Sequence, residues 1–221
     1  MIFSILSITL ISGCIGQVIT TKPETTTITL NEPPDIDISQ IERDVFDLVN
    51  AERVSHGLKP LIWNDEIVKI ARLHSEDMAE LNYFAHVNLD GLNVDDRLKK
   101  EQIYYWDTVA ENIFLQHTVE SYTYDEFGNL VNVVYKNQTF LTKETVDGWL
   151  NSIGHKENML KPEFNEAGVG IAEDLNGTKM YITLDFIIRV DCGYKGGPCC
   201  EKPGYLPSCY VPHECVSGIC E

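Results

Sequence analysis

Apolar residues recur at helical spacing in three stretches of the chain, which predicts three amphipathic helices. The first stretch covers residues 38–56, and its apolar face is formed by Ile38, Ile41, Val45, Leu48 and Val49. The second covers residues 64–81, where Asn64 is a suitable N-cap. The third covers residues 141–153, with Gly154 expected as the C-terminal cap. A shorter helix is expected from residue 92 to residue 100.

Other stretches have the alternating pattern of strands. Residues 108–119 predict a strand with Glu111 near its start, and residues 168–172 and 180–188 predict two more. The last two are separated by Asn176-Gly177, a strong hairpin signal. Residues 121–140 predict a separate hairpin that turns at residues 126–129 and is inserted into the domain.

The order of these elements indicates the fold class. Helices and strands do not alternate regularly, so a βαβ repeat is excluded. Helices that cover both faces of a mainly antiparallel sheet make an α-β-α sandwich. The predicted class is therefore α+β, with a small disulfide-rich tail after the sandwich.

The first residues have the features of an export signal. Residues 1–11 form an apolar run too short to cross a bilayer as a helix, so residues 1–13 are interpreted as a signal peptide. The run ends at Ser12-Gly13-Cys14, which resembles the lipobox of prokaryotic lipoproteins, where the cysteine thiol takes a diacylglycerol. Residues 14–37 are rich in Thr and Pro and predict an extended linker. Plain secretion and an uncleaved anchor are the alternatives to lipidation at Cys14.

Six of the seven cysteines lie in the last part of the chain, residues 191–221. This segment is too short and too rich in turns to bury a core, so disulfides are expected to hold it. An exported chain favours disulfides over a zinc ribbon, the competing interpretation. The pairing is left open, except that Cys199 and Cys200 are not expected to bond to each other. The expected disulfide cysteines are Cys192, Cys199, Cys200, Cys209, Cys215 and Cys220.

The formal net charge of −17 changes which partners are expected. Such a surface repels nucleic acid and anionic headgroups and favours cations, so no nucleic-acid partner is expected. Two sequons, at Asn137 and Asn176, are candidate glycosylation sites in an exported protein.

Three separated segments carry a resemblance to a known family: residues 82–86, 110–113 and 149–160, followed by Ala167-Gly168-Val169-Gly170-Ile171. In this order they resemble the CAP superfamily, which comprises cysteine-rich secretory proteins, antigen 5 and pathogenesis-related 1. Members are also called SCP-like extracellular domains, and the prokaryotic branch is the most similar. The resemblance covers residues 38–190 and implies the same α-β-α sandwich.

The resemblance also implies a site. Family proteins gather two histidines and two acidic residues in a cleft, and the matching positions here are His86, Glu111 and His155, while the fourth position is Ser152. Two imidazoles and a carboxylate suit Zn²⁺ or another divalent metal, with a coordination position left for water or substrate. Glu111 is the candidate catalytic residue, as a general base, if it does not touch the metal itself.

A purely structural interpretation of these histidines stands beside the functional one. His86, Glu111 and His155 could pin the sandwich through hydrogen bonds, since an unmade buried bond costs about 1–3 kcal/mol. His74 and Trp149 lie on apolar helix faces and are expected in the core.

Three functions remain open from the sequence. The first is a CAP-domain protein at the outer face of the cell membrane, lipid-anchored or secreted, that binds an extracellular ligand, lipid or protein, or a metal, through its His/Glu cleft. The second is a metal-dependent extracellular hydrolase acting on peptide or envelope polymer. The third is an interaction scaffold that uses the disulfide tail.

Overall fold

The computed structural model describes residues 33–192, 197–199 and 214–221. The predicted signal peptide, Cys14 and most of the linker lie outside the described residues, as do Cys200 and Cys209. Among the described helices, none is long and apolar enough to cross a bilayer.

A four-stranded sheet forms the centre of the domain, with strand order β1-β5-β6-β2. The strands are β1 (Ile62–Trp63), β2 (Trp106–His117), β5 (Glu166–Glu173) and β6 (Lys179–Arg189). β1 runs parallel to β5, whereas β6 runs antiparallel to both β5 and β2. The sheet is therefore mainly antiparallel, as predicted, and β2 forms one of its edges. The short β1 was not predicted, because two residues carry no alternation.

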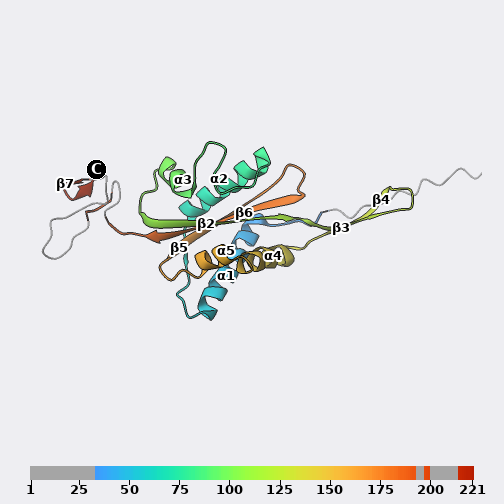
Figure 1. Ribbon diagram of the computed structural model, residues 1–221, viewed down its shortest axis with the longest axis horizontal. Coiled ribbons are helices and arrows are strands. Elements are labelled where there is room, and N and C mark those ends of the chain that lie inside the picture. The colour runs from blue at the N-terminus through green and yellow to red at the C-terminus, as the bar shows by residue number, and fades with distance from the viewer. Residues whose placement is uncertain (1–32, 193–196, 200–213) are drawn as a thin grey trace, which may run out of the picture.

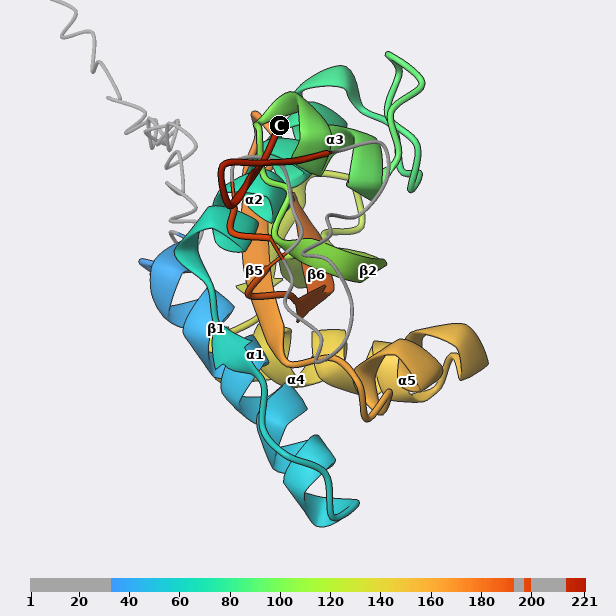
Figure 2. The same cartoon turned by 90° about the vertical axis from the view of Figure 1, so that its left-hand side faces the viewer.

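Helices cover both faces of this sheet, as Figures 1 and 2 show. One face packs against α2 (Asp65–Leu81), with α3 (Val94–Lys100) beside it. The other face packs against α1 (Ile38–Ser55), α4 (Gln138–Leu150) and α5 (Ile153–Met159). This arrangement confirms the predicted α-β-α sandwich.

Side-chain caps set the starts of the helices. The Asn64 side chain accepts hydrogen bonds from the backbone N–H groups of Glu66 and Ile67, at 2.9 and 3.3 Å, which confirms Asn64 as the N-cap of α2. Asn93 caps α3 and Asn137 caps α4 in the same way. Because Asn137 caps the helix, α4 begins at Gln138, three residues before the predicted start.

The predicted hairpin is shorter than expected for the same reason. Its strands are β3 (Val119–Tyr124) and β4 (Leu130–Tyr135), and the last residues assigned to it belong to α4. The hairpin extends away from the layered body, on the opposite side from β7 (Figure 1).

The prediction that the third helix ends at Gly154 was wrong. α4 ends at Leu150, the chain turns through Asn151 and Ser152, and a second helix, α5, begins at Ile153 with Gly154 inside it. The N–H of Ser152 bonds back to the carbonyl of Trp149 at 3.1 Å, while its own carbonyl accepts from Lys156 and starts the new helix. His155 therefore sits on a short helix of its own.

The core lies on both sides of the sheet. The larger cluster joins α1, α4 and the inner strands, and it contains Trp149 fully buried, as predicted. On the other face α2 crosses β5 very closely. A Cβ added at Gly170 would lie 2.0 Å from the backbone nitrogen of Arg72, so this crossing requires glycine.

The described part of the tail is a small two-stranded unit held by a disulfide. Cys199 is bonded to Cys215, which confirms a disulfide in the tail and the expectation that Cys199 does not bond to Cys200. Cys192 and Cys220 are disulfide-bonded as well. A zinc ribbon built on these four thiols is therefore ruled out. The strands of the unit are β7 (Cys215–Val216) and β8 (Ile219–Cys220).

Candidate functional site

The fold brings together the three residues to which the sequence assigned a site. Glu111 lies on the edge strand β2, His86 lies in the segment between α2 and α3, and His155 lies on α5 on the other face. The Nδ1 atom of His86 is 2.8 Å from Oε1 of Glu111. The ring centroids of His86 and His155 are 6.3 Å apart. Residues far apart along the chain thus form one cluster at the sheet edge.

Glu111 is held from a second side by Arg97 of α3, a residue that the sequence analysis missed. The Nη2 atom of Arg97 donates a hydrogen bond to Oε2 of Glu111, and its Nη1 donates to the backbone carbonyl of His86 at 3.0 Å. The Glu111 side chain is only 3% exposed. The carboxylate is therefore a buried anchor between a guanidinium and an imidazole.

His74 of α2 holds the same segment through its backbone. Its Nε2 lies 3.0 Å from the carbonyl of Ala85, the residue before His86, and 3.8 Å from Oε2 of Glu111. Burial lowers the pKa of His74, so the ring is neutral near pH 7 and Nε2 carries the proton that the carbonyl accepts. The predicted core position of His74 is confirmed, and the ring also positions the His86 segment.

Asp185 lies directly across from Glu111 on β6 and is fully buried. Among the described residues no donor bonds to either of its carboxylate oxygens. Burial, followed by the nearby Glu111, raises the pKa of Asp185 well above its usual range. The group therefore stays protonated to a higher pH than an exposed aspartate does. The sequence analysis did not single out this residue.

Two asparagines tie α5 to the strand that carries Glu111. The side chain of Asn112 donates to the carbonyl of His155 at 2.9 Å. Asn158 donates to Oδ1 of Asn112 at 2.9 Å and to the carbonyl of Glu111 at 3.3 Å. Both asparagines belong to the segments that carry the family resemblance, and their amides fix the position of His155 relative to Glu111.

Arg53 of α1 fixes the chain that follows α5. It is fully buried, and its Nη1 donates to the carbonyls of Met159 and Lys161 at 2.7 and 3.0 Å. Its Nη2 donates to the carbonyl of Phe164 at 3.0 Å, and its Nε to that of Lys59 at 3.0 Å. Within the described part of the chain, this guanidinium is satisfied by backbone carbonyls alone.

Both site histidines are at least partly exposed. The side chain of His86 is 53% exposed, and its Nδ1 lies 2.8 Å from the Glu111 carboxylate, so Nε2 is the ring nitrogen that this carboxylate does not contact. Burial, with a smaller contribution from His86, lowers the pKa of His155, so that ring stays neutral near pH 7. Neutral imidazoles are the form that binds metal ions.

Only two of the three predicted metal ligands are available to a divalent cation. In the segments that the structure describes, no group of three or more His, Cys, Asp or Glu is arranged to hold a metal ion. Both oxygens of Glu111 are already hydrogen-bonded, so the predicted three-ligand set is not assembled. Two imidazoles remain, and Glu111 sits behind His86 in the supporting position that metal-binding histidines commonly have.

The α-β-α sandwich and the segments around its histidines are those of an SCP-like domain. A family model matches the chain in the same region. The model of the cysteine-rich secretory protein family, CAP, matches residues 46–186. The chain belongs to the CAP family.

Two proteins of Bacillus subtilis strain 168 are similar to this chain. The uncharacterized membrane protein YlbC is 32% identical over 148 residues, which cover 67% of this chain and 34% of YlbC. The uncharacterized protein YkwD is 35% identical over 151 residues, which cover 68% of this chain and 49% of YkwD. The chain thus spans about a third and about half of the length of these two relatives.

Two solved structures have the same fold. An extracellular protein containing an SCP domain from Bacillus anthracis is 28% identical, with a TM-score of 0.51 over 67% of this chain and 40% of that chain. An outer surface protein from Borrelia burgdorferi is 18% identical, with a TM-score of 0.54 over 72% of this chain and 99% of that chain.

Proposed function

We propose that this protein is an exported CAP-domain protein that binds an extracellular ligand through His86 and His155, with a divalent cation such as Zn²⁺ between the protein and the ligand. The observation that carries the proposal is the pair of partly exposed imidazoles at the sheet edge, whose ring centroids are 6.3 Å apart. A cation on two protein ligands keeps open positions for a ligand group.

The surrounding residues support this use of the two rings. Glu111 orients His86 and raises the basicity of its free nitrogen, as carboxylates behind metal-binding histidines do. Asn112 and Asn158 hold the helix of His155 against the same strand. A bound cation would add a Lewis acid that polarises a carbonyl or phosphoryl oxygen of the ligand.

Export and anchoring belong to the same proposal. The apolar run of residues 1–11, followed by Ser12-Gly13-Cys14, supports a lipoprotein-type signal, and the segment after it supports a spacer that would hold the domain off the membrane. Disulfides in the tail fit an oxidising compartment. The similar Bacillus anthracis protein is itself described as extracellular.

Zinc titration by calorimetry tests the metal site. The purified, non-reduced protein is expected to bind close to one equivalent of Zn²⁺ near pH 7. Replacing both rings, His86→Ala with His155→Ala, is expected to abolish this binding because no protein ligand remains. Glu111→Gln is expected to weaken binding by about 10-fold or more, since Glu111 acts on the metal only through His86.

His117→Ala is the matched control, because His117 is an exposed histidine at the far end of the same strand. It should leave zinc binding unchanged. Zinc binding that survives in the double variant would assign the ion to other residues and end the proposal.

The hydrolase alternative requires Glu111 to act as a general base. In that role the carboxylate would have to give up its bond to Arg97 and accept a proton while 3% exposed. A screen of peptide, ester and glycan substrates with and without chelator tests it, and activity that ignores Glu111→Gln would remove this mechanism. The scaffold alternative is tested by deleting residues 193–221 and measuring whether a captured partner is lost.

A further inference from the structure

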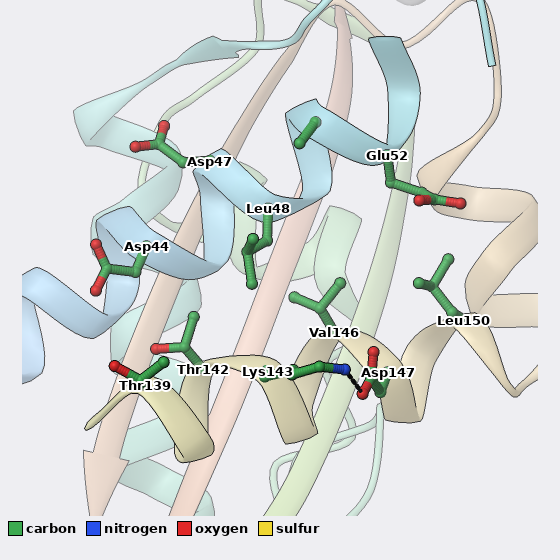
Figure 3. Close-up of a pocket in the computed structure, with 11 residues that line it drawn as sticks. Asp44, Asp47, Leu48, Glu52, Thr139, Thr142, Lys143, Val146, Asp147 and Leu150 are labelled. Atoms are coloured by element: carbon green, nitrogen blue, oxygen red, sulfur yellow. Dashed lines mark hydrogen bonds and ion pairs between the residues drawn. The ribbon is translucent and has the colours of Figure 1, made fainter. Parts of the chain in front are cut away.

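An open groove lies between α1 and α4, away from the histidine site (Figure 3). Its volume is about 580 Å³. The floor is apolar, because Leu48 and Ala51 of α1 face Val146 and Leu150 of α4. Leu48, on this floor, is 40% exposed.

The rim of the groove is acidic. Asp44, Asp47 and Glu52 line it from α1, and Asp147 lines it from α4, as the sticks in Figure 3 show. Lys143 is the one basic residue among the described lining residues, and its ammonium group is bonded to Asp147.

The carboxylates of α1 have few positive partners among the described residues. Asp44 accepts hydrogen bonds from the neutral amides of Gln40 and Gln138, at 2.8 and 3.2 Å, and forms no ion pair there. Among the described residues, the only potential cation next to Glu52 is His56, whose Nδ1 lies 3.4 Å from Oε1 of Glu52. The His56 ring is positive only when it is protonated. The groove is therefore an apolar trough with a negative edge on the α1 side.

We propose that this groove binds a basic amphipathic peptide segment of a partner protein. The apolar side chains of the segment lie on Leu48, Ala51, Val146 and Leu150, and its lysines or arginines lie against the carboxylates of the α1 rim. This is the helix-in-groove mode of recognition, with the charge pattern selecting the partner.

Charge disfavours the other occupants. A second copy of the chain carries a net charge of −17 and would be repelled. A fatty acid or an anionic lipid would bring its own negative group to the acidic rim. A cationic segment, in contrast, gains from every rim carboxylate.

The length of the groove suits a short segment. From Asp44 to Glu52 the helix rises about 12 Å, at about 1.5 Å per residue. A helical segment of about two to three turns covers that length. None of the residues that line the groove belongs to the histidine site, so the two proposals succeed or fail independently.

Fluorescence anisotropy with two labelled peptides tests the proposal on the full exported chain. The first peptide has leucines at helical spacing with lysines on its other face, and the second has the same leucines with glutamates. The lysine peptide is expected to bind, with an affinity that falls as NaCl is added, and the glutamate peptide is not. Leu48→Gln is expected to weaken binding because it places a polar group on the floor.

A triple variant removes the rim: Asp44→Asn, Asp47→Asn and Glu52→Gln. We expect it to weaken binding by about 10-fold, from the loss of three charge pairs at the surface. Its control removes three exposed carboxylates elsewhere, Glu80→Gln, Glu126→Gln and Glu157→Gln, and should bind like the wild type.

Any of the following three results would overturn the proposal. Equal losses in the rim variant and its control would show that the peptide follows net charge and not the groove. Unchanged binding in Leu48→Gln would exclude the apolar floor. Binding of a fatty acid that is lost in Leu48→Gln, together with no binding of the lysine peptide to the wild type, would assign the groove to a lipid chain.

Discussion

At the scale of single residues, the main feature of the site is a pair of buried carboxyl groups. Glu111 of β2 and Asp185 of β6 are direct partners on neighbouring strands. Arg97 supplies one positive charge next to the pair. Two ionised carboxylates beside one guanidinium would leave a buried negative charge unbalanced. Asp185 therefore stays protonated in the folded state, which costs stability whenever the unfolded chain would ionise it.

This cost predicts that Asp185→Asn stabilises the protein near pH 7. The pKa of Asp185 is raised by folding, so its contribution to stability is fully present below the unfolded pKa and is lost as the pH rises toward the folded pKa. Asparagine has the same shape and does not ionise. We expect a higher free energy of unfolding at pH 7, because asparagine removes the cost of keeping a proton on a group that ionises in the unfolded chain.

Urea unfolding of both proteins between pH 3 and pH 8 measures the gain, which should shrink as the pH falls to about 4. Asp90→Asn is the control at an exposed aspartate, and it should shift the midpoint very little. A difference between wild type and Asp185→Asn that does not change with pH would contradict the assignment.

The resemblance in the sequence led to Glu111 but not to its two charged neighbours. Asp185 is a lone acid in an apolar strand, Tyr181 to Ile188, and that contrast was a usable signal. Arg97 gave none. It lies in a short run of charged residues with Lys99 and Lys100, and only the fold determines which of them turns inward.

At the scale of elements, the predicted positions of α1 and α2, which each bury one face against the sheet, agree with the structure. Their apolar spacing encodes which side is buried, and Asn64 encodes where α2 begins. The break between α4 and α5 was missed because Ile153 continues the apolar spacing of Trp149 and Leu150 across it. The break depends on backbone bonds at Ser152 that side-chain spacing does not reveal.

The close crossing of α2 over β5 predicts that Gly170→Ala destabilises the domain. The added methyl group would meet the backbone of Ala71 and Arg72, which cannot move without shifting α2. We expect a loss of about 1–3 kcal/mol, measured by urea unfolding. The same substitution at Gly154, inside α5 with open space around its Cβ position, should be neutral or stabilising.

Similar stabilities for the two alanine variants would show that α2 can move away from β5. A loss at Gly154 alone would place the sensitive position on α5 instead.

At the scale of the whole molecule, the sequence indicated the layers but not the order of the strands. The pairing of β1 with β5 joins Ile62 to Glu166, far along the chain, and no local pattern near Ile62 predicts its parallel partner. The family resemblance alone predicted that three residues lie close together: His86, Glu111 and His155. Their spacing along the chain does not determine the distances between them in the fold.

The net charge of −17 predicts that salt stabilises the protein. Like charges repel one another in the compact state, and the repulsion is screened as the Debye length falls from about 30 Å at 0.01 M to about 10 Å at 0.1 M. We expect the free energy of unfolding to rise by roughly 1 kcal/mol over that range.

Thermal unfolding at several NaCl concentrations measures the effect. The variant with Glu80→Gln, Glu126→Gln and Glu157→Gln carries fewer negative charges and should show a smaller rise. A midpoint that falls with added NaCl would mean that favourable ion pairs outweigh the general repulsion.

Different kinds of bond hold the two sides of the site. Arg97 and Glu111 meet as two formal charges, so replacing the guanidinium by a neutral side chain would leave the buried carboxylate without its cation. Arg53 holds the chain after α5 through backbone carbonyl groups, which no substitution of a side chain removes. A neutral replacement of Arg97 would therefore loosen the His86 side, while His155 stays fixed to the body of the protein.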